Sequence, residues 1–133
     1  MATITKTFAV NNALEAVWAR LADPGQIHHL FSFLASAEVK EGARVCKTLD
    51  GAELHERVFS IDHETRRIAY TITRSPFEFE AHAASWQASG GDDGGTTVTL
   101  MIDVLPDEAA QGLDSMLEQE RPTIVAGLES KAG

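Results

Sequence analysis

Arg44 and Glu56 are charged residues in two segments whose other alternate positions are apolar. In the stretch ARVCKTLDGAELHERVFSID, Cys46, Leu54 and Val58 share their two-residue spacing. Successive side chains of a strand point to opposite faces, so the two charges share a face with apolar residues. This arrangement indicates an ion pair turned toward a core or a cavity. In a cavity, the arginine can hold a carbonyl or carboxylate oxygen and the glutamate can accept a proton alpha to the carbonyl.

The turn between the two segments decides whether Arg44 and Glu56 meet. A two-residue loop, Asp50-Gly51, would set Arg44 opposite Arg57, and like charges face to face are unfavourable. A three-residue loop with Gly51 left-handed in a bulge sets Arg44 opposite Glu56 instead. It also leaves the other face of both strands rich in charge, as a face in water should be. The second register therefore predicts an inward pair of opposite charges.

Later strands add candidates to the same inner face. If the next hairpin, through DHET, also has a loop with an odd number of residues, Tyr70 lies on the same face as Glu56 and becomes its neighbour. The following strand has two mixed faces, and we place His82 and Trp86 inward, with His82 near Tyr70. On the last strand Leu100 belongs to a clear apolar set with Val98 and Ile102. The candidate ligand-binding residues are therefore Arg44, Glu56, Tyr70, His82, Trp86, Leu54, Val58 and Leu100. The candidate catalytic pair is Glu56 as base and Arg44 as oxyanion clamp.

The same candidates have structural interpretations. An inward Arg44–Glu56 ion pair adds little net stability, because desolvation offsets the attraction. An interior histidine such as His82 is more often hydrogen-bonded than catalytic, and Tyr70 and Trp86 are more often core or cavity wall. For the isolated pair, the structural and the functional interpretation have similar weight.

Neither a metal site nor a cofactor site is expected. The histidines lack the paired spacing of metal ligands and are His28, His29, His55, His63 and His82. The glycine-rich SGGDDGGT has no following helix or lysine to hold phosphate, and a dinucleotide fingerprint is missing. Cys46 stands alone, with no histidine or basic helix end to activate it, so we expect a small buried hydrophobe.

Length and composition limit the number of domains, the partners and the location that we expect. The 133 residues suit one domain spanning 1–133. A formal net charge of −9 argues against nucleic acid and anionic membrane as partners. No apolar run approaches the about 20 residues of a spanning helix, and the first residues lack an export signal, so membrane insertion is not expected. With a single cysteine, we expect a cytoplasmic protein.

The chain must supply elements that position these residues. TITKTFAV reads as a strand, and NNALEAVWARLADPG as a helix that Asn12 and Glu15 start with a capping box. QIHHLFSFL is a second short helix, and six strands follow from about residue 37 to 105. Pro106 opens a long helix that Pro122 should bend. The pattern predicts an α+β fold in which a curved antiparallel sheet grips the long C-terminal helix, with two short helices after the first strand.

The order of these elements, with LEAVWARLADP, the ARVCKTLDGAELHERVFSID region and TTVTLMIDV, resembles a known superfamily. It is the START and birch-pollen-allergen superfamily called SRPBCC, in its polyketide cyclase/dehydratase-like branch. The resemblance implies a helix-grip fold: a seven-stranded sheet around a long helix, enclosing an apolar cavity. Related plant enzymes that rearrange small sulfenic acids use a cavity arginine and glutamate, which match Arg44 and Glu56. The position of a nearby tyrosine in those enzymes is occupied here by His82, so this sequence departs from their pattern at that position.

Three functions follow from these observations. The first is binding of a small hydrophobic or aromatic molecule in an internal cavity, with the ion pair anchoring one polar group. The second is a cofactor-independent cyclase, dehydratase or isomerase that uses Glu56 and Arg44, assisted by Tyr70 or His82. The third is an interaction module whose exposed face or open sheet edge binds a protein partner or a second copy, as a homodimer.

Overall fold

The computed structural model describes residues 1–130, and its strands form one antiparallel seven-stranded sheet in the order β1-β7-β6-β5-β4-β3-β2. The strands are β1 (Ala2–Val10), β2 (Leu34–Lys40), β3 (Ala43–Thr48), β4 (Glu53–Asp62), β5 (Arg67–Arg74), β6 (Ala81–Gly90) and β7 (Thr96–Leu105). The helices are α1 (Leu14–Leu21), the 3-10 helices η1 (Pro24–Leu30) and η2 (Asp92–Gly94), and α2 (Ala109–Glu129). The predicted seven strands, two short helices and long C-terminal helix are confirmed.

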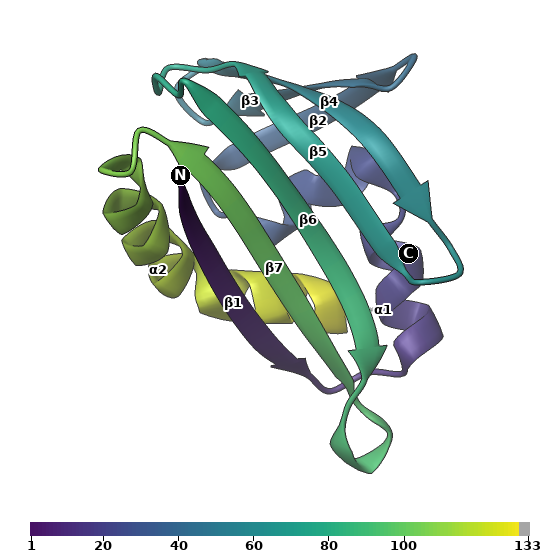
Figure 1. The fold of residues 1–133 in the computed structure, drawn as a ribbon. Helices are drawn as coiled ribbons and strands as arrows, with labels where there is room; N and C mark the ends of the chain where they lie inside the picture. Colours follow the sequence, from purple (N-terminus) through teal and green to yellow (C-terminus); the bar gives the residue numbers. More distant parts are fainter. Residues whose placement is uncertain (131–133) are drawn as a thin grey trace.

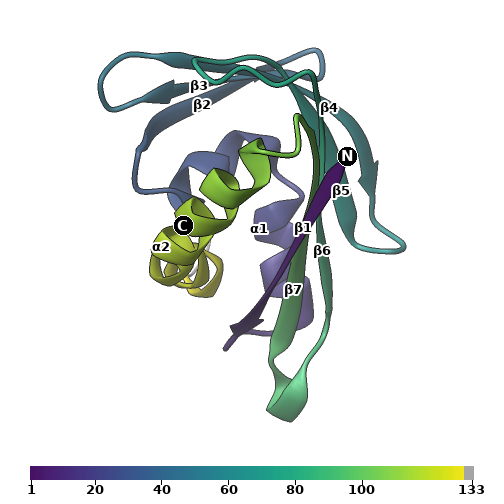
Figure 2. The ribbon, with the colours of Figure 1, turned by 60° about the vertical axis from the view of Figure 1, so that its left-hand side comes forward.

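The sheet is strongly curved, and α1 and α2 lie on its concave side. Figure 1 shows both helices behind the strands, with α2 near β1 and β7. Figure 2 shows the sheet from the side, where β2 and β3 arch over α2. This is the helix-grip arrangement that the sequence predicted, with the space between helix and sheet available for a core or a binding site.

The two short helices begin differently from the prediction. α1 starts after Ala13 and has no side-chain cap, because the Asn12 carboxamide oxygen accepts the N–H of Ala13 at 2.9 Å instead. The expected capping box was therefore wrong, since a cap must reach the free N–H groups further inside the helix. η1 begins at Pro24, two residues earlier than expected, where Asp23 accepts the N–H of Gly25 at 3.0 Å.

The long helix α2 is continuous through Pro122 and bent. Figure 1 shows it change direction between its green first half and its yellow second half. Pro122 cannot donate a hydrogen bond to the carbonyl of Glu118, four residues earlier, which leaves this part of the helix free to bend. Its fully buried apolar residues are Leu117, Ile124 and Leu128. No helix within residues 1–130 is long and apolar enough to cross a membrane.

An aromatic cluster fills the centre of the concave side. The Trp86 ring on β6 lies 6.1 Å from the Phe8 ring of β1 and 6.3 Å from the Phe31 ring that follows η1, measured between centroids. The predicted inner residues of β7 are buried, and these are Val98, Leu100 and Ile102. The centre of the molecule is thus a packed core, and a binding site must lie nearer to one of its ends.

The second half of α2 approaches η1 at Gly127. A Cβ at this position would lie 2.6 Å from the carbonyl oxygen of His29 and 2.7 Å from a methyl group of Leu30. Only a glycine lets the two helices come this close. The contact fixes the end of α2 against η1.

Candidate functional site

The β3–β4 hairpin has the predicted three-residue loop. The backbone N–H of Thr48 donates to the carbonyl of Ala52 at 2.8 Å, and Gly51 has a positive φ of 90°. In this register Arg44 pairs with Glu56, as predicted. A glycine is needed at the loop because other residues adopt this φ at a cost. Local turn chemistry therefore sets which two charged residues face each other.

Arg44 and Glu56 form a buried ion pair on the inner face of the sheet. The Nε atom of Arg44 lies 2.6 Å from Oε1 of Glu56, and the two side chains are 2% and 8% exposed. Nη1 of Arg44 donates to the carbonyl of Pro24 at 3.3 Å, and the guanidinium stacks on the Tyr70 ring at 4.8 Å from its centroid. The pair thus joins β3, β4, β5 and the start of η1.

Tyr70 and His82 lie next to the pair on β5 and β6. Register shifts in the β4–β5 pairing set Tyr70 directly opposite Val58, so Tyr70 is a diagonal rather than a direct neighbour of Glu56. The rings of Tyr70 and His82 lie 5.9 Å apart, which confirms the expected proximity. Burial, together with the Glu56 charge, raises the pKa of Tyr70, so its hydroxyl keeps its proton.

His82 is a neutral interior histidine. Its Nδ1 accepts the backbone N–H of Ile72 at 3.1 Å. Burial lowers the pKa of His82 to about 4. The thiol of Cys46 is equally inert, because burial and the neighbouring Glu56 carboxylate raise its pKa to about 12. Neither group is poised to exchange a proton near neutral pH.

A very small pocket lies beside the Arg44 guanidinium. We call it the Arg44 pocket, and it is lined by Arg20, Leu21, Asp23, Gln26, Ile27, Leu30, Arg44, Ile68, Tyr70 and Trp86. Among the described residues, Nη2 of Arg44, Nε of Arg20 and Nε1 of Trp86 are buried nitrogen atoms without a hydrogen-bond partner. The pocket volume is about 10 Å³, which suits about one water molecule. It is too small for an organic ligand.

A much larger groove opens at the end of the sheet where α2 begins. We call it the mouth groove, and it has a volume of about 770 Å³. Its walls are Phe33, the β3–β4 hairpin, the β5–β6 loop and the first turns of α2. The lining residues are Phe33, Thr48, Leu49, Asp50, Ala52, Leu54, Pro76, Phe77, Glu78, Phe79, Ala109, Gly112, Leu113 and Met116. The lining is mostly apolar and aromatic.

The structure brings Leu54, alone among the predicted site residues, into the lining of the mouth groove. The other seven are buried, pack against the core or lie beside the Arg44 pocket, and are Arg44, Glu56, Val58, Tyr70, His82, Trp86 and Leu100. His82 comes near the groove through Phe79, since their ring centroids are 5.4 Å apart. A ligand-binding or catalytic role for these seven residues stays a prediction.

The groove residues that sequence reasoning missed lie mostly outside regular strands. Phe77 and Phe79 alternate with glutamates in SPFEFE, which joins two strands, and Phe33 lies between η1 and β2. Large aromatic residues in a connecting segment are a signal of a binding surface. Their meeting with α2 depends on the curvature of the sheet. Residues 1–130 hold no cluster of three or more potential metal ligands.

Comparison with known proteins identifies the family. A family described as polyketide cyclase / dehydrase and lipid transport matches residues 1–130. The chain belongs to this family. No curated protein matches the sequence significantly.

Several solved structures share the fold of this polyketide cyclase / dehydrase family member. An uncharacterised protein from Bacillus thuringiensis has a TM-score of 0.86 at 16% identity, over 97% of this chain and all of its own. The protein XoxI from Bacillus cereus has a TM-score of 0.83 at 19% identity, over 97% of this chain and 94% of its own. Ara h 8.0201 has a TM-score of 0.73 at 16% identity, over 96% of this chain and 97% of its own. These likenesses show the fold.

Proposed function

We propose that the protein binds a small apolar molecule in the mouth groove. The observation that carries the proposal is the volume of about 770 Å³ behind an apolar and aromatic lining. Small-molecule sites in proteins have volumes of roughly 300–1,000 Å³ and mostly apolar walls. Membership of a family whose description includes lipid transport supports the same class of ligand.

Two apolar side chains at the rim support this proposal. Leu49 in the β3–β4 hairpin is 73% exposed, and Phe77 in the β5–β6 loop is 61% exposed. Both belong to the groove lining. A bound molecule that covers them removes apolar surface from water, and full burial of such a side chain is worth roughly 1.5–3 kcal/mol. The rim thus supplies part of the binding free energy.

The Arg44–Glu56 pair has a structural role in this proposal. Its two side chains are buried, and Arg44 is already bonded to Glu56 and to the Pro24 carbonyl. A ligand in the mouth groove meets neither charge, because neither residue lines the groove. A cyclase or dehydratase reaction with Glu56 as base needs the substrate to reach this carboxylate. Binding in the groove does not bring it there, so ligand binding is the function that the geometry favours.

A variant that fills the groove tests the proposal. Gly112 lies in the first turns of α2, lines the groove, and a Cβ there would meet no atom within 4 Å. Gly112→Trp should therefore fold and occupy the groove with its indole. The probe is N-phenyl-1-naphthylamine, a neutral apolar dye whose fluorescence rises on transfer from water. We expect the native protein to bind it and Gly112→Trp to lose at least about tenfold in affinity, or about 1.4 kcal/mol.

Two control variants separate blocking from other effects. Gly112→Ala adds only a methyl group and should bind the dye as the native protein does. Gln111→Trp places the same indole on an exposed neighbouring residue that does not line the groove, and should also bind normally. Equal dye affinity in Gly112→Trp and the native protein would refute binding in the mouth groove. Native mass spectrometry of protein purified from its own cell is an independent check, because a retained small molecule adds its mass to that of the protein.

A further inference from the structure

The charged residues that line the mouth groove are both acidic. Asp50 belongs to the β3–β4 hairpin and Glu78 to the β5–β6 loop, and both are exposed at the rim. The protein as a whole has a formal net charge of −9. We infer that the mouth groove selects apolar molecules whose polar end is neutral or cationic and discriminates against carboxylates. The inference rests on the proposed function, because it names the class of ligand for the same groove.

Asp50 keeps its negative charge at the rim. Its carboxylate accepts a hydrogen bond from the Thr48 hydroxyl and, at 3.4 Å, from the backbone N–H of Ala52. These hydrogen bonds lower the pKa of Asp50, with the Thr48 hydroxyl as the largest cause. The carboxylate is also held at the tip of a hairpin by the same contacts. A ligand whose polar end leaves the groove on this side meets a fixed negative charge.

The buried arginine does not offset these charges. Arg44 is 2% exposed, bonded to Glu56, and lines the Arg44 pocket, which shares no lining residue with the mouth groove. The basic residue nearest in the chain to the β5–β6 loop is Arg74, which ends β5 and is exposed, but it does not line the groove. A carboxylate in the mouth groove therefore gains no arginine or lysine partner among the lining residues.

The start of α2 offers no anion site either. The backbone N–H of Ala109 donates to the carbonyl of Pro106, and that of Ala110 donates to the carbonyl of Asp107, both at 3.1 Å. The Asp107 carboxylate before the helix is already paired with the N-terminal ammonium of Met1 at 3.2 Å, and the Glu108 side chain adds a negative charge at the end of the helix where the dipole is positive. The two bonded N–H groups and the Glu108 charge thus make this helix end a poor site for a carboxylate.

Three ligands with the same alkyl chain test the inference. Decylammonium, decanol and decanoate are each used at neutral pH to displace N-phenyl-1-naphthylamine from the native protein. At an ionic strength of about 0.01 M, where the Debye length is about 30 Å, we expect decylammonium to bind about tenfold more tightly than decanoate, with decanol between them. At about 1 M salt, where that length falls to about 3 Å, the difference should shrink to within about twofold.

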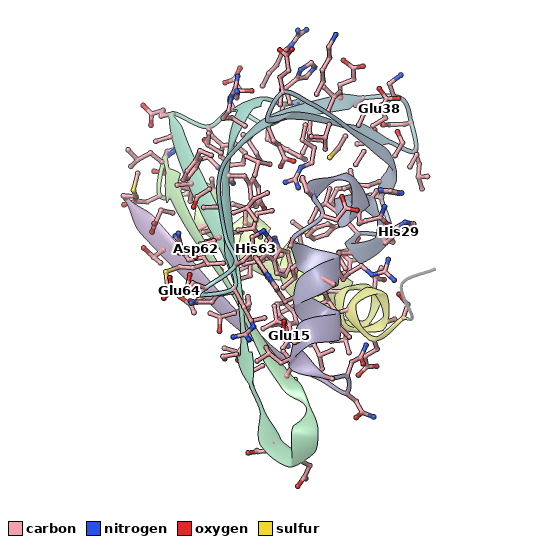
Figure 3. All side chains as sticks on the ribbon, turned by 90° about the vertical axis from the view of Figure 1, so that its right-hand side faces the viewer. Glu15, His29, Glu38, Asp62, His63 and Glu64 are labelled. Carbon is pink, nitrogen blue, oxygen red and sulfur yellow. The ribbon has the colours of Figure 1, made fainter. Side chains whose placement is uncertain are left out.

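Paired variants assign the preference to the rim. Asp50→Asn with Glu78→Gln should remove most of the difference between decylammonium and decanoate at low salt. The matched control is Glu38→Gln with Glu64→Gln, which removes two exposed charges outside the groove lining. Figure 3 shows Glu38 on β2 and Glu64 in the β4–β5 turn. This control has the same net charge as the rim variant and should keep the native preference.

The outcomes separate the inference from the proposed function. Decanoate binding as tightly as decylammonium, or more tightly, would overturn the inference and leave groove binding intact. A rim variant with an undiminished preference would also overturn it, as would a control variant that loses the preference. Failure of all three alkyl ligands and of the dye, or equal affinity in Gly112→Trp, would instead overturn the proposed function.

Discussion

The side chains of Arg44 and Glu56 lie on adjacent antiparallel strands and meet 2.6 Å apart beneath the curved sheet. The contact also includes η1, because Arg44 donates to the carbonyl of Pro24. It is isolated from the mouth groove, whose lining contains neither residue. Stability and ligand binding should therefore respond differently when the pair is changed.

Removing one member of the pair should destabilise the protein without changing ligand binding in the mouth groove. Glu56→Gln leaves a buried guanidinium without its counter-charge, and we expect the free energy of unfolding to fall by about 3–5 kcal/mol. Arg44→Met with Glu56→Leu removes both charges and should recover most of this loss. Urea unfolding measures the stability, and dye binding below the transition should be unchanged. A specific loss of dye affinity in the folded Glu56→Gln protein would assign the pair to the binding site.

Gly112→Ala should stabilise the protein. Gly112 is inside α2, and a Cβ at this position meets no atom within 4 Å. Alanine reduces the conformational freedom of the unfolded chain and favours the helix, so the free energy of unfolding should rise by about 0.5–1 kcal/mol. Thermal unfolding followed by circular dichroism measures the change. A lower melting temperature would mean that this turn of α2 needs the flexibility of glycine.

Gly127→Ala should have the opposite effect in the same helix. Its methyl group would lie 2.6 Å from the carbonyl oxygen of His29, so α2 and η1 must separate to admit it. Such overpacking costs about 1–3 kcal/mol. The same thermal measurement, made beside Gly112→Ala, compares two identical substitutions whose surroundings differ. Equal stabilisation by both would show that α2 and η1 do not touch at Gly127.

The stability of the protein should depend on pH through His82. Burial lowers the pKa of His82 from the ordinary value of 6.5 to about 4, so the unfolded chain binds a proton in this range that the folded chain does not. His82 therefore leaves the free energy of unfolding unaffected above pH 6.5 and lowers it as the pH falls from 6.5 to about 4. Urea midpoints at a series of pH values measure the slope. His82→Gln should flatten it, and an unchanged slope in the variant would contradict this assignment.

Much of the fold and part of the candidate site follow from local rules. The β3–β4 register was predictable because Gly51 suits a left-handed loop position and the alternative register sets Arg44 against Arg57. The strands were predictable because apolar residues alternate along them. The cap of α1 was wrong because Asn12 bonds to the adjacent Ala13 N–H, a choice between neighbouring donors that the sequence pattern does not resolve.

The mouth groove was not predictable from the same rules. Phe77, Phe33 and Leu113 come from a loop, a connection and a helix far apart in the chain, and only the curvature of the sheet brings them together. The expected space between helix and sheet does not reach the centre of the molecule, because Trp86 packs against Phe8 and Phe31 there. Side-chain alternation predicted which residues point inward. It could not tell whether the space they enter is filled.

The mouth groove takes its walls from two loop tips and the first turns of a helix, whereas the ion pair is embedded in the strands. Exchanges at Leu49, Phe77 or Leu113 can thus give the scaffold a new chemical preference without rebuilding its interior. An engineer seeking a sensor for another small molecule can begin with a library confined to the two loop tips and the first turns of α2.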